Sequence, residues 1–217
     1  MIKDLTSFYS KSATSMKRSE IRELLKVTRQ PDMISFGGGL PAPETFPVKD
    51  IEDISCTLLR EKGAMALQYG PTEGEMPIRE EIAKWMAREK STIKPENILV
   101  TSGSQQGLDI LGRVFLDPND VVIVELPTYI GGLQAFAAYR CKLVGVAQDD
   151  EGMKTDHLEK VLAKMAKRGK KPKFIYVVPD FQNPSGVTMS LARRKKLLEL
   201  AYKYGRNYNN TVFVIED

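Results

Sequence analysis

Four polar sites in this chain combine residue types that could hold a flat, phosphorylated ligand. They are a Ser-Gly-Ser-Gln-Gln segment at 102–106, the aromatic ring of Tyr129, the Asn-Pro-Ser-Gly turn that begins at Asn183, and the carboxylate of Asp217. Each site directly follows an apolar stretch typical of a β-strand. In an open parallel sheet, ligands bind in the crevice outside the carboxyl ends of the strands. The sequence therefore predicts that the four sites line one pocket.

The segment at 102–106 has the composition of a phosphate-binding loop. Gly103 permits close approach of the backbone, and Ser102 and Ser104 supply hydroxyl groups. The helix that we expect from about Gln105 presents free N–H groups to an anion. An equally open interpretation is that Ser104 only caps this helix. The spacing matches neither the dinucleotide-binding glycine pattern nor a Walker loop, so a nucleotide site is not supported.

The other three sites offer groups suited to an aromatic ring. Tyr129 could stack on a flat ligand, although a lone tyrosine is more often part of the packing. Asn183 could bond a polar ring substituent, although its turn is also ordinary by composition. Asp217 could be a solvated strand end, or it could pair with a protonated ring nitrogen. Pyridoxal phosphate needs such an acid, because a protonated pyridine is a better electron sink. The joint occurrence of the four sites, in this chain order, favours that cofactor.

Composition and charge narrow the class of protein. The 217 residues are 42% hydrophobic and 28% charged, with a net charge of +4, which is ordinary for a globular protein. Acidic and basic residues are mixed, which argues against a nucleic-acid surface. The basic stretch at 164–173 is interpreted as a solvated helix end, with an anionic partner as the alternative. No run reaches the length of a transmembrane helix.

Cysteine and histidine usage points to a reducing compartment and to no metal. Cys56 and Cys141 lie far apart without CxxC spacing, and they fit free thiols in a cytoplasmic protein. His157 is the single histidine of the chain, so a zinc site is not expected.

The elements that must position the four sites alternate from residue 97 onward. We predict strands at 97–101, 121–125, 142–146, 174–178 and 212–216, and helices at 105–115, 130–139, 156–167 and 191–204. Apolar, β-branched strands alternating with helices indicate an α/β fold: a mostly parallel, doubly wound sheet with flanking helices. The earlier part predicts helices at 15–28, from about Pro47, and at 77–89, with a glycine-rich turn at 34–41. Asp156 and Glu159 have the spacing of a capping box.

Five segments, in their order and spacing, carry a specific resemblance over almost the whole chain. They are IRELLK at 21–26, SFGGGLPAPE at 35–44, LQYGPTEG at 67–74, GSQQ at 103–106 and FQNPSG at 181–186. The chain resembles the N-terminal half of a fold-type I, class I/II aminotransferase that depends on pyridoxal phosphate. It is most similar to the 2-aminoadipate and kynurenine aminotransferase II-like branch. The resemblance implies an incomplete cofactor-binding large domain at 47–217, preceded at 1–46 by a helical arm of the small domain.

The resemblance also implies roles for the residues at matching positions. The cofactor phosphate would be held by Ser104 and Gln105, with Ser102 and Gly103 shaping the loop. Tyr129 would stack on the pyridine ring. Asn183 would bond the 3-oxygen of the cofactor and contact the substrate, and Asp217 would bond the ring nitrogen.

Three further positions would serve the substrate and a neighbouring subunit. Tyr69 would reach the phosphate held by the neighbouring subunit, so that a homodimer would share its active sites. Gly39 would line the pocket for the substrate carboxylate. Arg22, on a helix that would cover the substrate, would meet an acidic side chain, with a solvated surface charge as the alternative.

The chain departs from the family pattern after Asp217. The family continues to a tyrosine, to the Schiff-base lysine, to a phosphate-binding arginine and to a second substrate-binding arginine. The lysine is both the nucleophile and the proton carrier of the reaction. We therefore expect that the 217 residues belong to a longer chain and contain no catalytic residue. By themselves they would expose apolar surface and be inactive.

The expected activity is transfer of an amino group from an acidic, aromatic or branched amino acid to a 2-oxo acid, commonly 2-oxoglutarate. A lyase on the same fold is one alternative, because lyases share the cofactor-binding half. A regulator that uses an aminotransferase-like domain as a ligand sensor is another. Such regulators carry a DNA-binding domain before this part, and the roughly twenty residues before the Arg22 helix would leave no room for one. A different phosphate-binding α/β module is the third.

Overall fold

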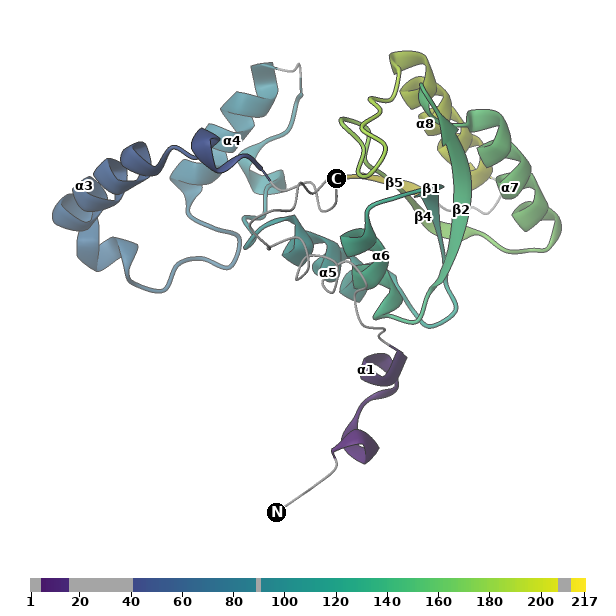
Figure 1. The fold of residues 1–217 in the computed structure, drawn as a ribbon, viewed down its shortest axis with the longest axis horizontal. Helices are drawn as coiled ribbons and strands as arrows, with labels where there is room; N and C mark the ends of the chain where they lie inside the picture. Colours follow the sequence, from purple (N-terminus) through teal and green to yellow (C-terminus); the bar gives the residue numbers. More distant parts are fainter. Residues whose placement is uncertain (1–4, 16–40, 89–90, 207–211) are drawn as a thin grey trace, which may run out of the picture. The chain divides into compact units, whose positions relative to one another are not determined.

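The computed structural model of the chain describes residues 5–15, 41–88, 91–206 and 212–217 (Figure 1). Two compact units share the chain. The first, called the sheet unit, comprises Met1–Gly39 and Gly103–Asp217, and the second, the helical unit, comprises Leu40–Ser102. The helix at 15–28 and the turn at 34–41 that the sequence predicts lie mostly outside the described residues, as do Arg22 and Gly39.

The sheet unit contains a five-stranded sheet. Its strands are β1 Val121–Leu126, β2 Lys142–Asp149, β3 Gly152–Met153, β4 Pro172–Val177 and β5 Phe213–Glu216. They lie side by side in the order β3-β2-β1-β4-β5, with every neighbouring pair parallel except β2 and β3. The chain passes from β1 to β2 on one side and returns to β4 on the other side of β1. The strand order therefore reverses at the carboxyl ends of β1 and β4, the position where ligands bind in the crevice of such sheets.

Helices cover both faces of this sheet, as Figure 1 shows. On one face lie α5 Ser104–Phe115 and α6 Ile130–Ala137, and on the other lie α7 Thr155–Lys167 and α8 Leu191–Arg206. Alternate residues of β1 serve the two layers, because Ile123 packs against α7 and α8 whereas Val122 and Val124 pack against α5 and α6. The predicted α/β sheet with flanking helices is confirmed. The central strands β1 and β4 consist mostly of apolar residues because both of their faces are buried.

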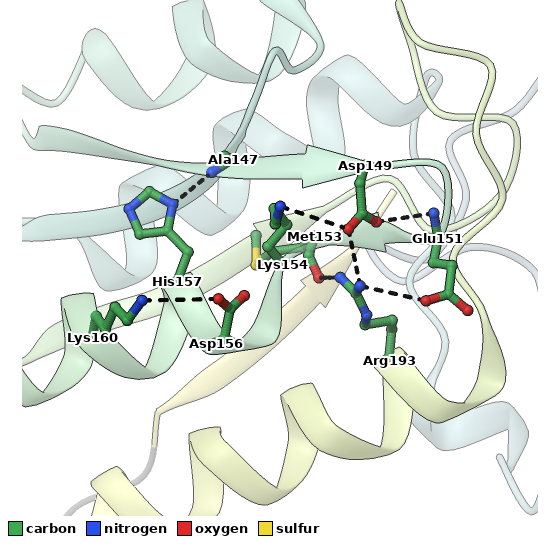
Figure 2. Close-up of polar contacts among 9 residues, drawn as sticks. All are labelled: Ala147, Asp149, Glu151, Met153, Lys154, Asp156, His157, Lys160 and Arg193. Carbon is green, nitrogen blue, oxygen red and sulfur yellow. Dashed lines mark hydrogen bonds and ion pairs between the residues drawn. The ribbon is translucent and has the colours of Figure 1, made fainter.

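The antiparallel strand β3 was not predicted. Its two residues, Gly152 and Met153, pair with the end of β2, and Arg193 of α8 contacts both strands of this hairpin (Figure 2). The guanidinium lies 3.0 Å from the carboxylate of Asp149 and 3.4 Å from that of Glu151, and it donates a hydrogen bond to the Met153 carbonyl. A two-residue strand has no periodicity to detect in the sequence, and it is defined by its pairing with β2.

His157 is also part of the structure around the hairpin. Its Nδ1 accepts a hydrogen bond from the backbone N–H of Ala147, and this bond joins α7 to β2 (Figure 2). The predicted capping box at Asp156 and Glu159 is wrong. The helix begins one residue earlier, with Lys154 at the N-cap, so both carboxylates lie inside it. Glu159 instead forms a 2.6 Å ion pair with Lys203 of α8.

The helical unit consists of α3 Val48–Ala66 and α4 Met76–Arg88, with short 3-10 turns at Pro43–Thr45 and Pro95–Asn97. Both α-helices were predicted. The strand predicted at 97–101 is wrong, because the Pro95–Asn97 turn occupies its start and no strand of the described chain pairs with it. Its Ile98 N–H bonds the Pro95 carbonyl within that turn, and its Val100 N–H bonds the Glu73 carbonyl. A strand needs a ladder of such bonds, and the sequence alone cannot supply the partner.

The N-terminal residues of the sheet unit form a 3-10 turn at Thr6–Phe8 and the short helix α1 Lys11–Ser15. The hydroxyl of Ser12 donates a hydrogen bond to the carbonyl of Ala138, just beyond α6. Among the residues that the structure describes, no helix has both the length and the apolar composition needed to cross a membrane.

Candidate active site

The N-terminus of α5 lies next to the first turn of α6. Gly103 is the N-cap of α5 with a φ of 84°, a left-handed conformation that favours glycine. The alternative that Ser104 caps the helix is therefore wrong, because Ser104 is its first helical residue. Ser104 and Gln105 are both exposed, and the Gln105 amide donates a 3.2 Å hydrogen bond to the Gly131 carbonyl in α6. Exposed N–H groups at the start of a twelve-residue helix suit an anion.

Tyr129 stands at the start of α6, immediately after β1. It is the N-cap residue of that helix, and its ring is half-buried against the backbone of Gly131, where an added Cβ would collide with it. The same Gly131 carbonyl receives the Gln105 amide. The helix α6 thus brings the aromatic ring and the start of α5 to the same place.

Asp217 follows β5 and is held by a tyrosine that the sequence interpretation missed. The buried Tyr176 of β4 donates a 2.6 Å hydrogen bond to the Asp217 Oδ2 atom, and the backbone N–H of Asp217 donates to the Val177 carbonyl. Burial and the neighbouring Asp217 carboxylate raise the pKa of Tyr176, so this hydroxyl keeps its proton and remains a donor. The carboxylate itself is exposed, so it can accept a further hydrogen bond from a ligand.

The ring of Tyr176 also connects Asp217 to α6. A Cβ added at Gly132 would lie 2.7 Å from the Tyr176 hydroxyl oxygen, so a glycine is required for this approach. Gln105, Tyr129 and Asp217 are therefore linked through the first turn of α6 and through Tyr176. A tyrosine inside the buried strand β4 was the available signal, because a buried hydroxyl needs a polar partner.

Glu125 is a second residue that sequence reasoning missed. It lies near the end of β1 with 1% of its surface exposed, and its Oε2 atom accepts a 3.0 Å hydrogen bond from the Val178 N–H. Burial raises the pKa of Glu125, and the hydrogen bonds from Val178 and Gln182 offset this effect only in part. A carboxylate inside an apolar run could have identified it, but its partners are remote in sequence.

Asn183 lies on the loop that follows β4, with its side chain exposed. The preceding residue, Gln182, is buried and donates a 2.9 Å hydrogen bond to the Pro127 carbonyl. The loops after β1 and β4 are thereby joined at the crevice. In this same place the hydroxyl of Thr128 is buried and, among the described residues, is the one buried side-chain oxygen without a hydrogen-bond partner. An unpartnered polar atom beside a crevice is consistent with a site for a polar ligand.

The remaining predicted residues belong to the helical unit or lie outside the described residues. Tyr69 is fully exposed at 100% of its surface, and Ser102 is the last residue of that unit. Arg22 and Gly39 are not among the residues that the structure describes. The described part of the chain holds no group of three or more His, Cys, Asp or Glu side chains placed to bind a metal ion.

The donor set at the crevice fits a phosphorylated aromatic cofactor. The start of α5 offers N–H groups and hydroxyls for a phosphate, and Tyr129 offers a ring. Asp217 offers an oriented carboxylate that can pair with a protonated ring nitrogen. The fold is that of an α/β protein whose strand order reverses at β1, and these groups lie on the loops and helix ends beside that point.

Comparison with known proteins identifies the family to which the chain belongs. It belongs to the aminotransferase class I and II family, whose model matches residues 31–207. The aromatic-amino-acid aminotransferase 1 of Thermococcus litoralis is 52% identical over 202 residues, and the match covers 93% of this chain and 48% of that protein. The 2-aminoadipate transaminase of Thermus thermophilus is 42% identical over 209 residues, with 96% and 49% covered.

Solved structures agree with the sequence relatives. The kynurenine aminotransferase of Pyrococcus horikoshii, solved in complex with PMP, has a TM-score of 0.89 and 48% identity to this chain. The match covers 99% of this chain and 52% of that one. The chain thus spans about half the length of the curated relatives it matches. The resemblance to the aminoadipate and kynurenine aminotransferase branch is confirmed.

Proposed function

We propose that the full-length protein containing this chain is an aminotransferase that depends on pyridoxal 5'-phosphate. It would move an amino group from an amino acid to a 2-oxo acid, with 2-oxoglutarate as the expected acceptor. The observation that carries the proposal is the linkage of α5, Tyr129 and Asp217 at one crevice, through Gly131 and Tyr176. Membership of the aminotransferase class I and II family supports it.

Each residue at the crevice would have a distinct task. Ser104 and Gln105, with Gly103 and Ser102 shaping the loop, would bind the phosphate at the positive end of α5. Tyr129 would stack against the ring, and Asn183 would bond the 3-oxygen and contact the substrate. When bound, the cofactor supplies an electron sink for the carbon that loses its proton.

Asp217 would hold a proton at the ring nitrogen. Its carboxylate is already oriented by the Tyr176 hydroxyl at 2.6 Å, so no reorganisation would be needed when the ring arrives. A carboxylate that is in place before binding stabilises the positive charge on the nitrogen without first losing ordering free energy. Tyr176 would therefore act on the cofactor through Asp217.

The experiment that tests this function compares Asp217→Ala with Asp109→Ala in the full-length protein. Asp109 is the matched control, because it lies on α5 and accepts a 2.9 Å hydrogen bond from the hydroxyl of Tyr139, just beyond the end of α6. We expect Asp217→Ala to lower kcat by about 100-fold to 1,000-fold, the usual loss for a group that stabilises developing charge. Asp109→Ala should keep kcat. Aromatic, acidic and branched amino donors would be assayed with 2-oxoglutarate, and near wild-type turnover in Asp217→Ala would contradict the assignment.

A homodimer with shared active sites is part of the proposal. Tyr69, whose side chain is fully exposed, would bind the phosphate of the neighbouring subunit. Tyr69→Phe removes one hydroxyl bonded to a charged group, which corresponds to about tenfold weaker cofactor affinity. The dissociation constant for pyridoxal phosphate, measured by absorbance titration, checks this. An unchanged constant would remove Tyr69 from the phosphate site.

The proposal also covers the substrate contacts, the domain bounds and the location in the cell. Arg22 would meet an acidic substrate side chain, and Gly39 would line the pocket for its carboxylate. Residues 1–46 would belong to the arm of the small domain, and residues 47–217 to the cofactor-binding domain. Both cysteines are free thiols, which supports a cytoplasmic location.

A further inference from the structure

The side chain of Gln182 is buried between the loops that follow β1 and β4. Only 2% of its surface is exposed. Its Nε2 atom donates to the Pro127 carbonyl at 2.9 Å and to the Glu125 carboxylate at 3.4 Å. Its Oε1 atom accepts from the Ser185 N–H at 2.9 Å and from the Ser185 hydroxyl at 2.7 Å. One amide thus uses both of its ends on two different loops.

The chemistry of these partners fixes the orientation of the amide. The Pro127 carbonyl can only accept a hydrogen bond, and the Ser185 N–H can only donate one. Rotating the Gln182 amide by 180° would place oxygen against the carbonyl and nitrogen against the N–H group. In that arrangement the Pro127 carbonyl, the Glu125 carboxylate and the Ser185 N–H would lose their bonds, and only the Ser185 hydroxyl could still bond, by accepting from the amide nitrogen. The amide therefore has a single stable orientation, and it holds both loops in one register.

Each of these loops carries a predicted cofactor residue very close to the amide. Tyr129 is two residues after Pro127, and Asn183 is the residue next to Gln182. The second loop also adopts a costly backbone shape, since Phe181 has a φ of 48°, in the left-handed region that a bulky residue avoids. The contacts of Gln182 compensate for this strain by holding the loop from inside.

Gln148 provides a natural comparison for Gln182. Its Nε2 atom donates to the same Pro127 carbonyl at the same distance of 2.9 Å, and its Oε1 atom accepts from the Ser185 hydroxyl at 3.4 Å. Gln148 is half-buried, so water can replace its contacts when they are lost. Two glutamines therefore donate to the Pro127 carbonyl, and of these two only Gln182 is fully buried.

We propose that Gln182 is a positioning residue that sets the spacing between the Tyr129 ring and the Asn183 amide. This inference rests on the proposed function, because the spacing matters only if both groups bind one cofactor. Gln182 does not itself touch the cofactor in this proposal. It acts by joining the backbone before Tyr129 to the backbone beside Asn183, so that both groups are in place before the ring binds.

The test is the matched pair Gln182→Met and Gln148→Met in the full-length protein. Methionine keeps the length and most of the volume of glutamine but forms no strong hydrogen bond. We expect Gln182→Met to weaken pyridoxal phosphate binding by about tenfold, and to lower kcat/KM by about tenfold to a hundredfold through misplacement of the reacting groups. Gln148→Met should stay within about twofold of wild type in both quantities, because water replaces its bonds.

Two readouts that do not depend on turnover separate positioning from a purely structural role. The first is the absorbance band of the bound cofactor, which should shift or broaden in Gln182→Met if the ring environment is disturbed. The second is amide hydrogen exchange at Ser185, whose N–H loses its acceptor and should exchange faster than in Gln148→Met. Should Gln182→Met fail to fold, Ser185→Ala removes the 2.7 Å hydroxyl bond to Gln182, together with the longer 3.4 Å contacts of that hydroxyl with Gln148 and the Val187 N–H, and should weaken cofactor binding by about threefold.

The outcomes distinguish this inference from the function on which it rests. A wild-type protein that shows no cofactor band overturns the proposed function and this inference with it. A normal wild-type band together with equal cofactor affinities in the two methionine variants overturns the inference alone. Faster exchange at Ser185 with unchanged cofactor affinity and spectrum would also overturn it, because Gln182 would then serve only the stability of the loop.

Discussion

The sheet unit and the helical unit of this chain differ in what their apolar residues contact. In the sheet unit, Phe174 and Tyr176 of β4 pack edge-on against Phe136 of α6, with ring centroids 5.0 and 5.3 Å apart, and all three are fully buried. In the helical unit, α3 buries none of its residues, and Trp85 of α4 is 66% exposed. The sheet unit therefore carries its own hydrophobic core within the described residues, whereas the described helices α3 and α4 do not.

The buried support in the sheet unit is where groups can be preorganised for chemistry. The described cofactor groups from Ser104 to Asp217 all lie on the sheet unit, where side chains such as Tyr176 and Gln182 are held by packing on every side. A group on rigid, buried support keeps its geometry without ligand. Tyr69 on the helical unit is fully exposed, so its position depends on what it will meet. The proposed intersubunit role for Tyr69 is consistent with this contrast.

Truncation of one aromatic side chain in each unit should destabilise the two units to very different extents. In the 217-residue chain, Phe174→Ala should lower the free energy of unfolding by about 3–5 kcal/mol, because it leaves a cavity beside Phe136. Trp85→Ala, its counterpart in the helical unit, should change it by less than about 1 kcal/mol, because the exposed ring contributes little burial. Urea unfolding followed by circular dichroism measures both.

Repeating the pair in the full-length protein would extend the result. If Trp85→Ala cost as much as Phe174→Ala in the 217-residue chain, the contrast between the two units would be wrong. If the two costs became equal only in the full-length protein, the helical unit would obtain its core from residues outside the 217-residue chain.

A pair of glycine substitutions gives a smaller effect of opposite sign in the two units. Gly132→Ala in α6 should lower the free energy of unfolding by about 1–3 kcal/mol, because its Cβ would meet the Tyr176 hydroxyl oxygen at 2.7 Å. Gly63→Ala in α3 should raise it by about 0.5–1 kcal/mol, because nothing lies within 4 Å and alanine favours a helix. Thermal unfolding of the two variants measures the signs, and destabilisation by Gly63→Ala would reveal an unseen contact of α3.

The regular elements of the sheet unit could be predicted because their signals are local. The apolar run from Val121 and the run from Phe174 are buried on both faces, and their composition shows it without reference to any partner. The stretch at 97–101 has a similar composition but forms no strand, because no partner in the described chain supplies a ladder. Local composition therefore indicates a capacity for strand formation, and the neighbouring chain decides the outcome.

The candidate site also contains residues that the sequence could predict and residues that it could not. The predicted strands were enough to put Tyr129 and Asp217 just after β1 and β5, and their roles at a ligand stay predictions. The side chains that support them could not be predicted. Glu125 bonds a residue 53 positions away, and Tyr176 bonds one 41 positions away, so their roles exist only once the sheet has formed.

Each unit buries an ionisable side chain, Glu125 in the sheet unit and Arg79 in the helical unit. The contributions of these two side chains to the free energy of unfolding should differ in how they depend on pH, and this difference should be small. Burial raises the pKa of Glu125, so the folded protein holds this proton at pH values where the unfolded chain has released it. The stability that Glu125 contributes is therefore complete below its unfolded pKa of about 4.3 and is lost as the pH rises through the folded value. Glutamine carries no such charge, so the advantage of Glu125→Gln over wild type should grow with pH across this window.

Urea unfolding of the full-length protein at several pH values between about 4 and 8 measures that advantage. Arg79→Met is the counterpart in the helical unit, where the Arg79 Nε donates to the Pro95 carbonyl at 3.0 Å. Its cost should be nearly the same at each pH, because a guanidinium keeps its charge throughout this range. A constant difference between Glu125→Gln and wild type would mean that the Glu125 carboxyl exchanges no proton on folding. The hydrogen bonds from Val178 and Gln182 would then balance the cost of burying its charge.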